Sequence, residues 1–401
     1  MRSILPRRSP RQRGFSLVEL MVGIGVGLLS TVVIATILSN SERQKRASSS
    51  GNDAQIAGSL ALNELDRSIK DAGYGLTTDM GAMGCTLQAR YDAGTALASA
   101  PANLRPVLIT PDKDGKPSII TLMRSTAPSF SLPAKVKSPL FDPGVASGSP
   151  KTTLVLSSTL GIVQNDLLAV VTPPDDPTTK LGACTVFQAS SLGANLRDVQ
   201  RVADAPWNGT GDLAAATSDQ YVINLGALEV QTYTVEPQVN SKGVSTSQYQ
   251  LTLTRYIMRD RASTTQVIQT GVVDLKAFYG RDSDGDGIVD IYDTSTPTTA
   301  QGWSQVRSVR LAVLARSEQF EKEEVTASEP LWNVGSAVKV AGSIDCGSSK
   351  CIKMNPKAGD DSWKHYRYKL FDLISPLRNQ LWRSDMVVPE PASAPASAAA
   401  P

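Results

Sequence analysis

The sequence predicts an α+β fold in which one long amino-terminal helix packs on an antiparallel, β-rich body. Residues 17–38 form an apolar run that contains a single charge and is long enough for a membrane-spanning helix. An apolar stripe of helical period then continues to about residue 72. Beyond Gly75 the chain changes to short β-branched runs separated by Gly, Pro, Asp and Ser.

Composition disfavours several classes of function. Forty Lys and Arg against 38 Asp and Glu give a net charge of +2, too even to indicate a nucleic-acid surface, so we predict no nucleic-acid partner. His365 is the only histidine in 401 residues, which argues against most histidine-dependent catalysis and most zinc sites. The sequence also lacks a Gly-x-Ser-x-Gly motif. We therefore expect no enzyme.

The charges before the apolar run predict how the chain crosses the membrane. Five arginines precede the run and no acid stands among them: Arg2, Arg7, Arg8, Arg11 and Arg13. The positive-inside bias keeps such an end in the cytoplasm. The helix should therefore cross the membrane once, with the body on the far side.

The residues at the start of the run resemble a known family. Gly14-Phe15-Ser16-Leu17-Val18-Glu19-Leu20 is similar to the type IV prepilin signature, in which a glycine and an aromatic residue precede an acid. The resemblance implies that prepilin peptidase cleaves between Gly14 and Phe15 and that Phe15 is then N-methylated. It implies a pilin-like fold, with residues 1–14 as leader and residues 15–72 as the stem helix.

Glu19 is the one charge within the apolar run. A carboxylate inside a membrane is costly without a partner, so an intramembrane acid suggests a function. The new amine of Phe15, in a neighbouring subunit or in the same chain, can neutralise it during subunit assembly. The alternative is a plain signal anchor in which Glu19 snorkels to the nearby headgroups.

Three glycines in the run leave two interpretations open. Gly23 and Gly27 form a small-xxx-small pair that allows close approach of helices. Gly23, Gly25 and Gly27 also weaken the helix, so that it can unwind locally during assembly.

The stem is expected to continue past the membrane as an amphipathic helix. Its apolar stripe consists of Leu62, Leu65, Ile69 and Ala72. Gly73 and Gly75 supply a stop. The serines and glycine at 48–51 are expected to interrupt the helix briefly.

Residues 73–388 are expected to form the β-rich body. The predicted strands are 118–123, 152–157, 166–172, 184–189, 221–235, 248–259, 266–279, 306–315 and 366–373. Residues 76–117 and 127–150, rich in Ala, Gly, Pro and Ser, are predicted to be long surface loops. The tail, residues 389–401, is predicted to be disordered because it has almost nothing to bury.

An acidic stretch near residue 290 has the spacing of a calcium loop. Carboxylates occupy loop positions 1, 3, 5, 9 and 12, with Gly287 at position 6 and the Ile288 carbonyl as the backbone ligand; the acids are Asp282, Asp284, Asp286, Asp290 and Asp293. An all-oxygen set suits a hard cation better than zinc. The alternative is a solvated Asp/Gly turn between strands. We favour calcium in a structural role.

Four cysteines permit three disulfide connectivities. Cys346 and Cys351 enclose a short loop and form a plausible local pair. Cys85 and Cys184 would then pair with each other, in an exported body that can hold disulfides.

A second stretch resembles the carboxy-terminal half of PilW-type minor pilins: the acidic loop preceded by Tyr279, then Trp303 and the strand 306–317. The resemblance implies a minor pilin that takes part in type IV pilus assembly, in a priming or tip complex. Its partners would be prepilin peptidase, other minor pilins, the major pilin and the inner membrane, with the body first in the periplasm and then at the cell surface. The alternative is a minor pseudopilin of a type II secretion system.

Overall fold

A computed structural model describes residues 14–76, 80–92, 95–96, 101–113, 116–128, 133–141, 153–202, 205–208, 220–356 and 361–381. The leader up to residue 13 and the tail 389–401 lie outside these residues. The chain divides into two compact units, Met1–Asn52 and Asp53–Pro401. The helix α1 (Leu17–Asp71) runs from the first unit into the second.

The first unit consists of the amino-terminal part of α1. Its apolar side chains from Leu17 to Leu38 are exposed. The helix continues through residues 48–51, so the expected interruption there is wrong. Serine and glycine each lower helix stability by only about 1 kcal/mol or less relative to alanine, and helical residues on both sides propagate the hydrogen-bonding pattern across them.

The second unit holds the amphipathic part of α1. Its buried stripe consists of residues spaced three or four apart: Ala54, Ala57, Ala61, Leu65, Ile69 and Ala72. The helix ends as predicted, with Gly73 and Gly75 at positive φ (76° and 71°). Gly75 is also required for space, since a Cβ there would lie 2.6 Å from the Cβ of Ser125.

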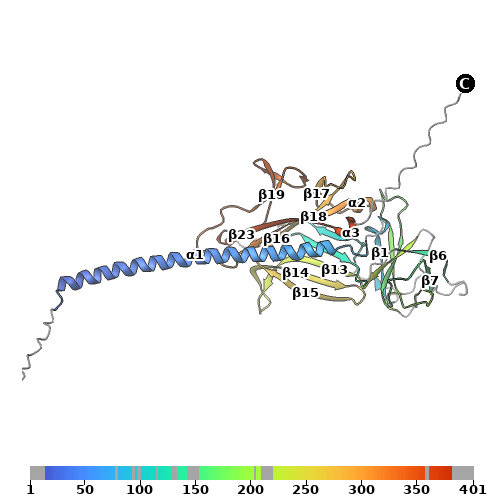
Figure 1. The fold of residues 1–401 in the computed structure, drawn as a ribbon, viewed down its shortest axis with the longest axis horizontal. Coiled ribbons are helices and arrows are strands. Elements are labelled where there is room, and N and C mark those ends of the chain that lie inside the picture. The colour runs from blue at the N-terminus through green and yellow to red at the C-terminus, as the bar shows by residue number, and fades with distance from the viewer. Residues whose placement is uncertain are drawn as a thin grey trace, which may run out of the picture. The chain divides into compact units, whose positions relative to one another are not determined.

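Two five-stranded sheets cover this stripe (Figure 1). The first has the order β15-β14-β13-β5-β4 and the second β20-β17-β16-β18-β23. Leu65 and Ile69 share one core with Leu251 and Leu253 of the first sheet and with Leu311 of the second. The strands of the two sheets are β4 (Val107–Thr110), β5 (Ile119–Arg124), β13 (Glu229–Val239), β14 (Ser245–Ile257), β15 (Ala262–Thr270), β16 (Val272–Arg281), β17 (Ile291–Asp293), β18 (Val306–Arg316), β20 (Lys339–Val340) and β23 (Tyr368–Pro376).

An eight-stranded sheet, with order β1-β9-β8-β12-β6-β7-β11-β10, builds two further cores. Its pairs are antiparallel except for β1 with β9. Its strands are β1 (Thr86–Gln88), β6 (Ala134–Phe141), β7 (Thr153–Leu156), β8 (Leu167–Thr172), β9 (Ala183–Gln188), β10 (Ser191–Leu192), β11 (Asp198–Gln200) and β12 (Tyr221–Gly226). The predicted α+β class, a helix with a mostly antiparallel β-rich body, is confirmed.

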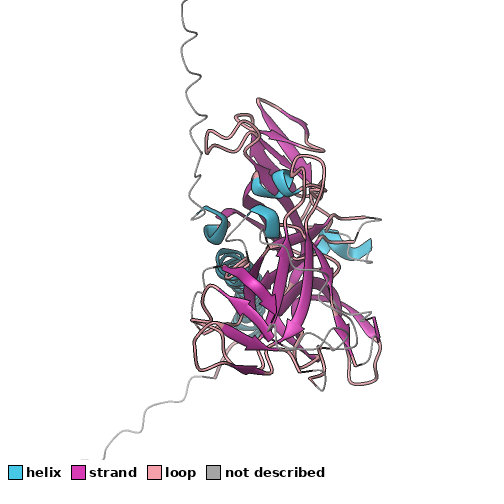
Figure 2. Cartoon of the chain, turned by 90° about the vertical axis from the view of Figure 1, so that its right-hand side faces the viewer, coloured by secondary structure: helices cyan, strands magenta, loops and turns pink. Residues whose placement is uncertain are grey.

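The remaining elements are short (Figure 2). A three-stranded sheet has the order β19-β22-β21, and β2 pairs with β3. Their bounds are β2 (Arg90–Tyr91), β3 (Thr95–Ala96), β19 (Leu331–Gly335), β21 (Ile344–Cys346), β22 (Ser349–Lys353), α2 (Ala300–Ser304), α3 (Arg378–Leu381), and the 3₁₀ turns η1 (Met80–Ala82) and η2 (Asp361–His365).

Two of the strands predicted as single runs are each divided into two strands in the structure. The run 221–235 divides at Gly226 (φ 59°), where a Cβ would lie 2.5 Å from the backbone nitrogen of Ala127. The run 266–279 divides at Gly271 (φ 80°). In both places the glycine lets the chain turn from one sheet into another within a continuous β-branched pattern.

The prediction of long surface loops at 76–117 and 127–150 is wrong where the described residues form strands, chiefly β4 and β6. Val107 and Ile109 of β4 are buried in the core beside the helix, and Ala134 and Val136 of β6 are buried in the eight-stranded sheet. Both strands lie among Ala-, Gly- and Pro-rich residues, so the composition of the region did not indicate them, and neighbouring strands supply the surface that covers them.

Candidate functional sites

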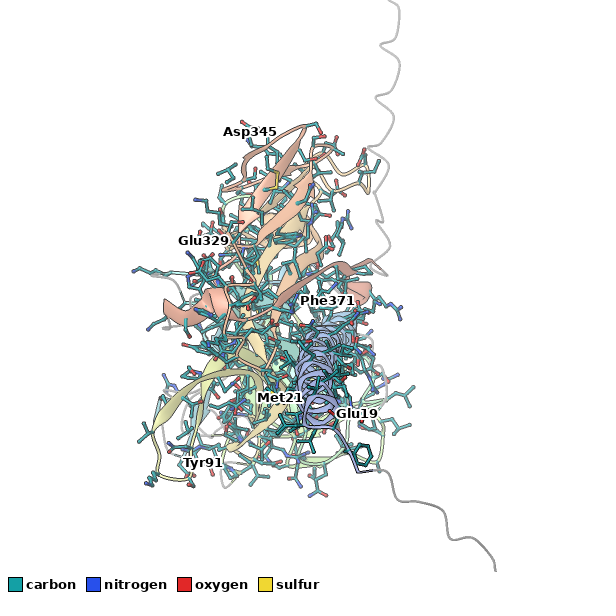
Figure 3. All side chains as sticks on the ribbon, turned by 90° about the vertical axis from the view of Figure 1, so that its left-hand side faces the viewer. Glu19, Met21, Tyr91, Glu329, Asp345 and Phe371 are labelled. Carbon is teal, nitrogen blue, oxygen red and sulfur yellow. A yellow bond between two sulfur atoms is a disulfide. The ribbon has the colours of Figure 1, made fainter. Side chains whose placement is uncertain are left out.

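The processing residues lie at the start of α1. Gly14, Phe15 and Ser16 are exposed and precede the helix, and the Leu20 N–H donates to the Ser16 carbonyl (3.1 Å). Glu19 lies in the first helical turn, where Figure 3 labels it beside Met21. The Gly14–Phe15 bond is therefore outside helical structure, while Glu19 is already within it.

One segment of the described chain, Leu17–Glu42, is long and apolar enough to cross a membrane. It ends slightly later than the expected 17–38. With the prepilin-like signature directly before it, this segment is consistent with a membrane-anchored pilin.

The acidic loop connects β16 to β17. Gly285 and Gly287 have φ of 84° and 89°, so the chain bends where the spacing predicted a turn. Asp282 is 1% exposed; its Oδ1 accepts from the Gly285 N–H (2.7 Å) and its Oδ2 from the Gly287 N–H (3.0 Å). The loop is thus organised around one buried carboxylate.

The structure brings three of the predicted ligands together. Carboxylate oxygens of Asp282, Asp284 and Asp290 lie within 4.8 Å of one another. Arg307 donates to Asp282 Oδ2 at 3.0 Å and offsets part of the repulsion among the three acids.

Asp286 and Asp293 do not belong to that group of carboxylates. Asp293, at loop position 12, belongs to β17 and pairs with Arg281 (3.0 Å). Asp286 accepts from the Ile288 N–H (2.7 Å), and the Ile288 side chain is 66% exposed. The spacing alone therefore suggested a larger ligand set than this loop conformation gathers.

The strands behind the loop explain why it lies where it does. Tyr279 of β16 and Trp303 of α2 are both buried, with ring centroids 6.0 Å apart. The Asp282 N–H donates to the Gln305 carbonyl (2.9 Å), which ties the loop to the chain entering β18. The acidic loop, Trp303 and β18, which follow one another in the sequence, are therefore also in contact or hydrogen-bonded through neighbouring residues in the fold.

Two disulfides cross-link the body. Cys85 is bonded to Cys184, and Cys346 to Cys351. The first joins the residue before β1 to β9, and both of its cysteines are fully buried. The second closes the turn between β21 and β22.

His365, the histidine noted in the sequence, packs as part of the fold. Its Nδ1 lies 2.9 Å from the Glu321 carbonyl oxygen, and its ring stacks on Phe320.

Two buried acids that the sequence analysis missed lie on β strands. Glu229 pairs with Arg124 (2.8 Å) and Arg255 (2.6 Å). Burial alone would raise the pKa of Glu229, but the hydrogen bond from Gln231 and the two arginines leave this pKa below its ordinary value of 4.5. The mixed polar sequences of β5, β13 and β14 gave no signal of this cluster.

Asp274, on β16, is in the opposite situation. Its carboxylate accepts from the backbone N–H groups of Leu275 (2.9 Å) and Asn355 (2.8 Å). Burial raises the pKa of Asp274 from its ordinary 3.8 to about 6, although Lys276 and the two N–H donors lower it.

We expect Asp274→Asn to gain stability relative to the parent protein as pH rises from about 4 to about 7. In that interval the Asp274 carboxyl is still protonated in the folded parent but already ionised in the unfolded chain. The free energy of unfolding of the parent therefore falls as pH rises, whereas asparagine does not ionise. Each pKa unit corresponds to about 1.36 kcal/mol, and the difference between 3.8 and about 6 gives about 3 kcal/mol. Urea unfolding of the full chain in detergent, at a series of pH values, measures the difference.

Glu229→Gln is the matched control and should show the opposite sign. Its carboxylate has a lowered pKa, so its ionised form stabilises the fold at pH values above that pKa. The variant should lose stability relative to the parent as pH rises through the acidic range. A pH-independent difference for Asp274→Asn would contradict the raised pKa.

Two family models match the chain. Residues 232–379 match the family described as Type IV Pilus-assembly protein W, and residues 9–35 match the Prokaryotic N-terminal methylation motif. A search of curated proteins and a search of solved structures each returned no match. The first range contains the acidic loop and β18, and the second contains Gly14, Phe15 and Glu19. The resemblance to a PilW-type minor pilin is confirmed, and the two matches support a type IV pilus-related pilin.

Proposed function

We propose that this type IV pilus-related chain is a minor pilin that joins the priming or tip complex of the pilus as a structural, non-enzymatic subunit. The observation that carries the proposal is the order of parts along the chain. A methylation motif leads directly into a continuous 55-residue helix, and the β-rich body built on that helix contains the match to the pilus-assembly family. That match favours a pilus over the alternative of a type II secretion filament.

Processing would prepare the helix for assembly. Prepilin peptidase removes residues 1–14 on the cytoplasmic side, and the N-methylated amine of Phe15 then lies four residues from Glu19 along the chain. The Glu19 carboxylate is neutralised within the inner membrane by such an amine, either that of the same chain or that of a neighbouring subunit. The body, first in the periplasm, then moves with the filament to the cell surface.

The test is deletion of the gene and its restoration in trans, with surface pili counted by electron microscopy. We expect few or no pili after deletion, normal pili after restoration, and a mature chain that begins with methylated Phe15 by mass spectrometry. Normal piliation in the deletion strain would remove the assembly role. Loss of type II secretion with intact pili would favour the pseudopilin.

We also propose that the loop of Asp282, Asp284 and Asp290 binds calcium in a structural role. The support is three convergent carboxylates and a loop bent at two glycines of positive φ. Oxygen ligands at a partly exposed loop suit the weak affinity of extracellular calcium modules, with Kd of about 0.1 to 1 mM.

Calcium at about 10 mM should raise the melting temperature of the full chain. With a Kd of about 1 mM, ligand binding adds about 1.4 kcal/mol to the free energy of unfolding. For a chain of this size that corresponds to a shift of about 2 °C, because the entropy of unfolding grows by about 2.1 cal/mol/K per residue. Differential scanning calorimetry with calcium and with a chelator measures it.

Asp284→Ala should remove the calcium-dependent shift. Asp175→Ala is the matched control, because the Asp175 side chain is 97% exposed and lies outside the loop. No shift in the parent protein, or an equal shift in Asp284→Ala, would eliminate the calcium site.

A further inference from the structure

A polar pocket lies in the body, remote in sequence from the helix and from the acidic loop. Its volume is about 380 Å³. Five segments form its wall: the strand β2, the turn before β8, the end of β9, residues 205–208 after β11, and the turn between β14 and β15. The lining residues that matter below are Asn165, Gln188, Arg259, Asp260, Tyr91 and Trp207. Figure 3 labels Tyr91 at the lower edge of the body in that view.

One wall of the pocket is held in place by a buried amide network. Asn208, 2% exposed, accepts from the Gln188 N–H (2.7 Å) and donates to the Gln188 carbonyl (2.9 Å) and to the Val202 carbonyl (2.9 Å). The Asn165 N–H donates to the Ala189 carbonyl (2.7 Å). These hydrogen bonds hold the backbone of the pocket residues Gln188 and Asn165 in place.

Gln188 has an unused acceptor. Its side chain donates through Nε2 to Asn165 Oδ1 (3.3 Å), but its Oε1 has no hydrogen-bond partner although the residue is only 7% exposed. A buried polar atom without a partner destabilises a fold. The atom is enclosed by the protein, so a ligand would meet the polar surface of this wall and not this acceptor itself.

The opposite wall is aromatic and rigid. Trp207 is 2% exposed and donates through Nε1 to the Arg259 carbonyl (3.0 Å). Tyr91 meets the Trp207 ring edge-on, with centroids 5.2 Å apart, and the Arg261 guanidinium lies 4.5 Å from the centre of the Tyr91 ring. Trp207 is buried and the Tyr91 ring packs against Trp207 and Arg261, so this wall is rigid but presents little apolar surface to the pocket.

The two charged side chains at the pocket, Arg259 and Asp260, form an ion pair with each other. Arg259 donates to both carboxylate oxygens of Asp260, through Nε at 2.8 Å and through the guanidinium Nη2 at 3.2 Å. A phosphate or a zwitterion would have to compete with this bidentate pair. A neutral ligand can instead donate to Asp260 and accept from Arg259 while the pair stays intact.

We propose that this pocket binds a neutral saccharide unit of about hexose size. Each sugar hydroxyl both donates and accepts a hydrogen bond, which fits a lining of amides, one carboxylate and one guanidinium. The site goes beyond the assembly role and its test is independent of it, because purified protein is used. A free sugar or the end of a surface polysaccharide supplies the same chemistry.

The experiment uses the full chain in a detergent without a sugar headgroup. Glucose, galactose, mannose and N-acetylglucosamine are tested by saturation-transfer NMR, and dextran and mannan beads are tested in parallel for retention of the protein. We expect at least one neutral sugar to bind with a Kd of about 1 mM, a weak affinity. Signals from soluble sugars alone identify a free sugar as the source; retention on beads alone identifies a polymer.

Two variants locate the binding. Asp260→Ala, at a half-exposed side chain, should weaken the affinity by about tenfold or more, which is the effect of losing about 1.4 kcal/mol. Gln188→Leu should also weaken it, and Asp175→Ala should not. Melting temperatures verify that each variant is folded. The proposal is overturned by the absence of binding to every neutral sugar and bead. It is equally overturned by parental affinity in both pocket variants, or by tighter binding of N-acetylneuraminate than of any neutral sugar.

Discussion

Glu19→Ala is expected to reduce surface piliation as strongly as deletion of the gene. In the mature chain the variant leaves the amine of Phe15, or that of a neighbouring subunit, without its carboxylate inside the membrane. An unpaired charge costs about 2.5 to 3.5 kcal/mol at the centre of a bilayer on insertion scales and less toward its surface, and Glu19 lies near the start of the apolar segment. At the upper limit of about 3 kcal/mol, the loss lowers an assembly equilibrium by about 100-fold. Counting pili, and blotting sheared filaments for the subunit, measures the effect.

Two controls separate this role from general damage to the helix. Asp53→Ala removes another exposed acid of α1, outside the apolar segment, and should leave piliation normal. Cleavage of Glu19→Ala, assayed by the size of the membrane-bound chain, distinguishes a processing defect from an assembly defect. Normal pili in Glu19→Ala would support the alternative in which the acid merely snorkels to the headgroups.

Removal of the Cys85–Cys184 disulfide is expected to destabilise the body more than any other change considered above. The bond joins residues 99 apart in sequence, and in the chain-entropy description a closed loop of about 100 residues stabilises the fold by about 4 to 5 kcal/mol. Both cysteines are fully buried, so alanine is the substitution that leaves no unpaired polar group. Denaturant unfolding of the double variant Cys85→Ala and Cys184→Ala, in detergent, measures the loss.

The second disulfide is the internal control. Cys346 and Cys351 are only five residues apart, and the same description gives about 2 kcal/mol for so short a loop. The double variant Cys346→Ala and Cys351→Ala should therefore unfold at a higher denaturant concentration than the first variant. Equal losses from the two disulfides would contradict an effect governed by loop length.

Local sequence patterns predicted the elements that are indicated by residues close to one another in the sequence. The stripe through Leu65 and Ile69 identified the buried face of α1, and Gly73 and Gly75 identified its end. The alternation around Leu251 and Leu253 identified β14. In each case the partner surface selects residues at the period of the element itself.

Local patterns failed where a distant segment decided the structure. Val107 and Ile109 lie in a region of loop-like composition, yet β4 completes the sheet beside the helix. Asp293 has the spacing of a calcium ligand, but Arg281, which flanks it across the β16–β17 pair, binds its carboxylate. The pocket at Gln188 draws on five separate segments and has no motif in the sequence.

By itself, the sequence determined the membrane-crossing segment, the prepilin-like signature, the long helix and the β-rich class of the body. These follow from hydrophobic length, from charge placement and from residue period, which are properties of neighbouring residues. The tertiary structure alone decided which strands share a sheet and which acids converge. It also decided that Gln188, Arg259 and Asp260 line one pocket. Contacts of that kind depend on bringing together residues far apart in the chain, and the surface that makes each contact favourable exists only after folding.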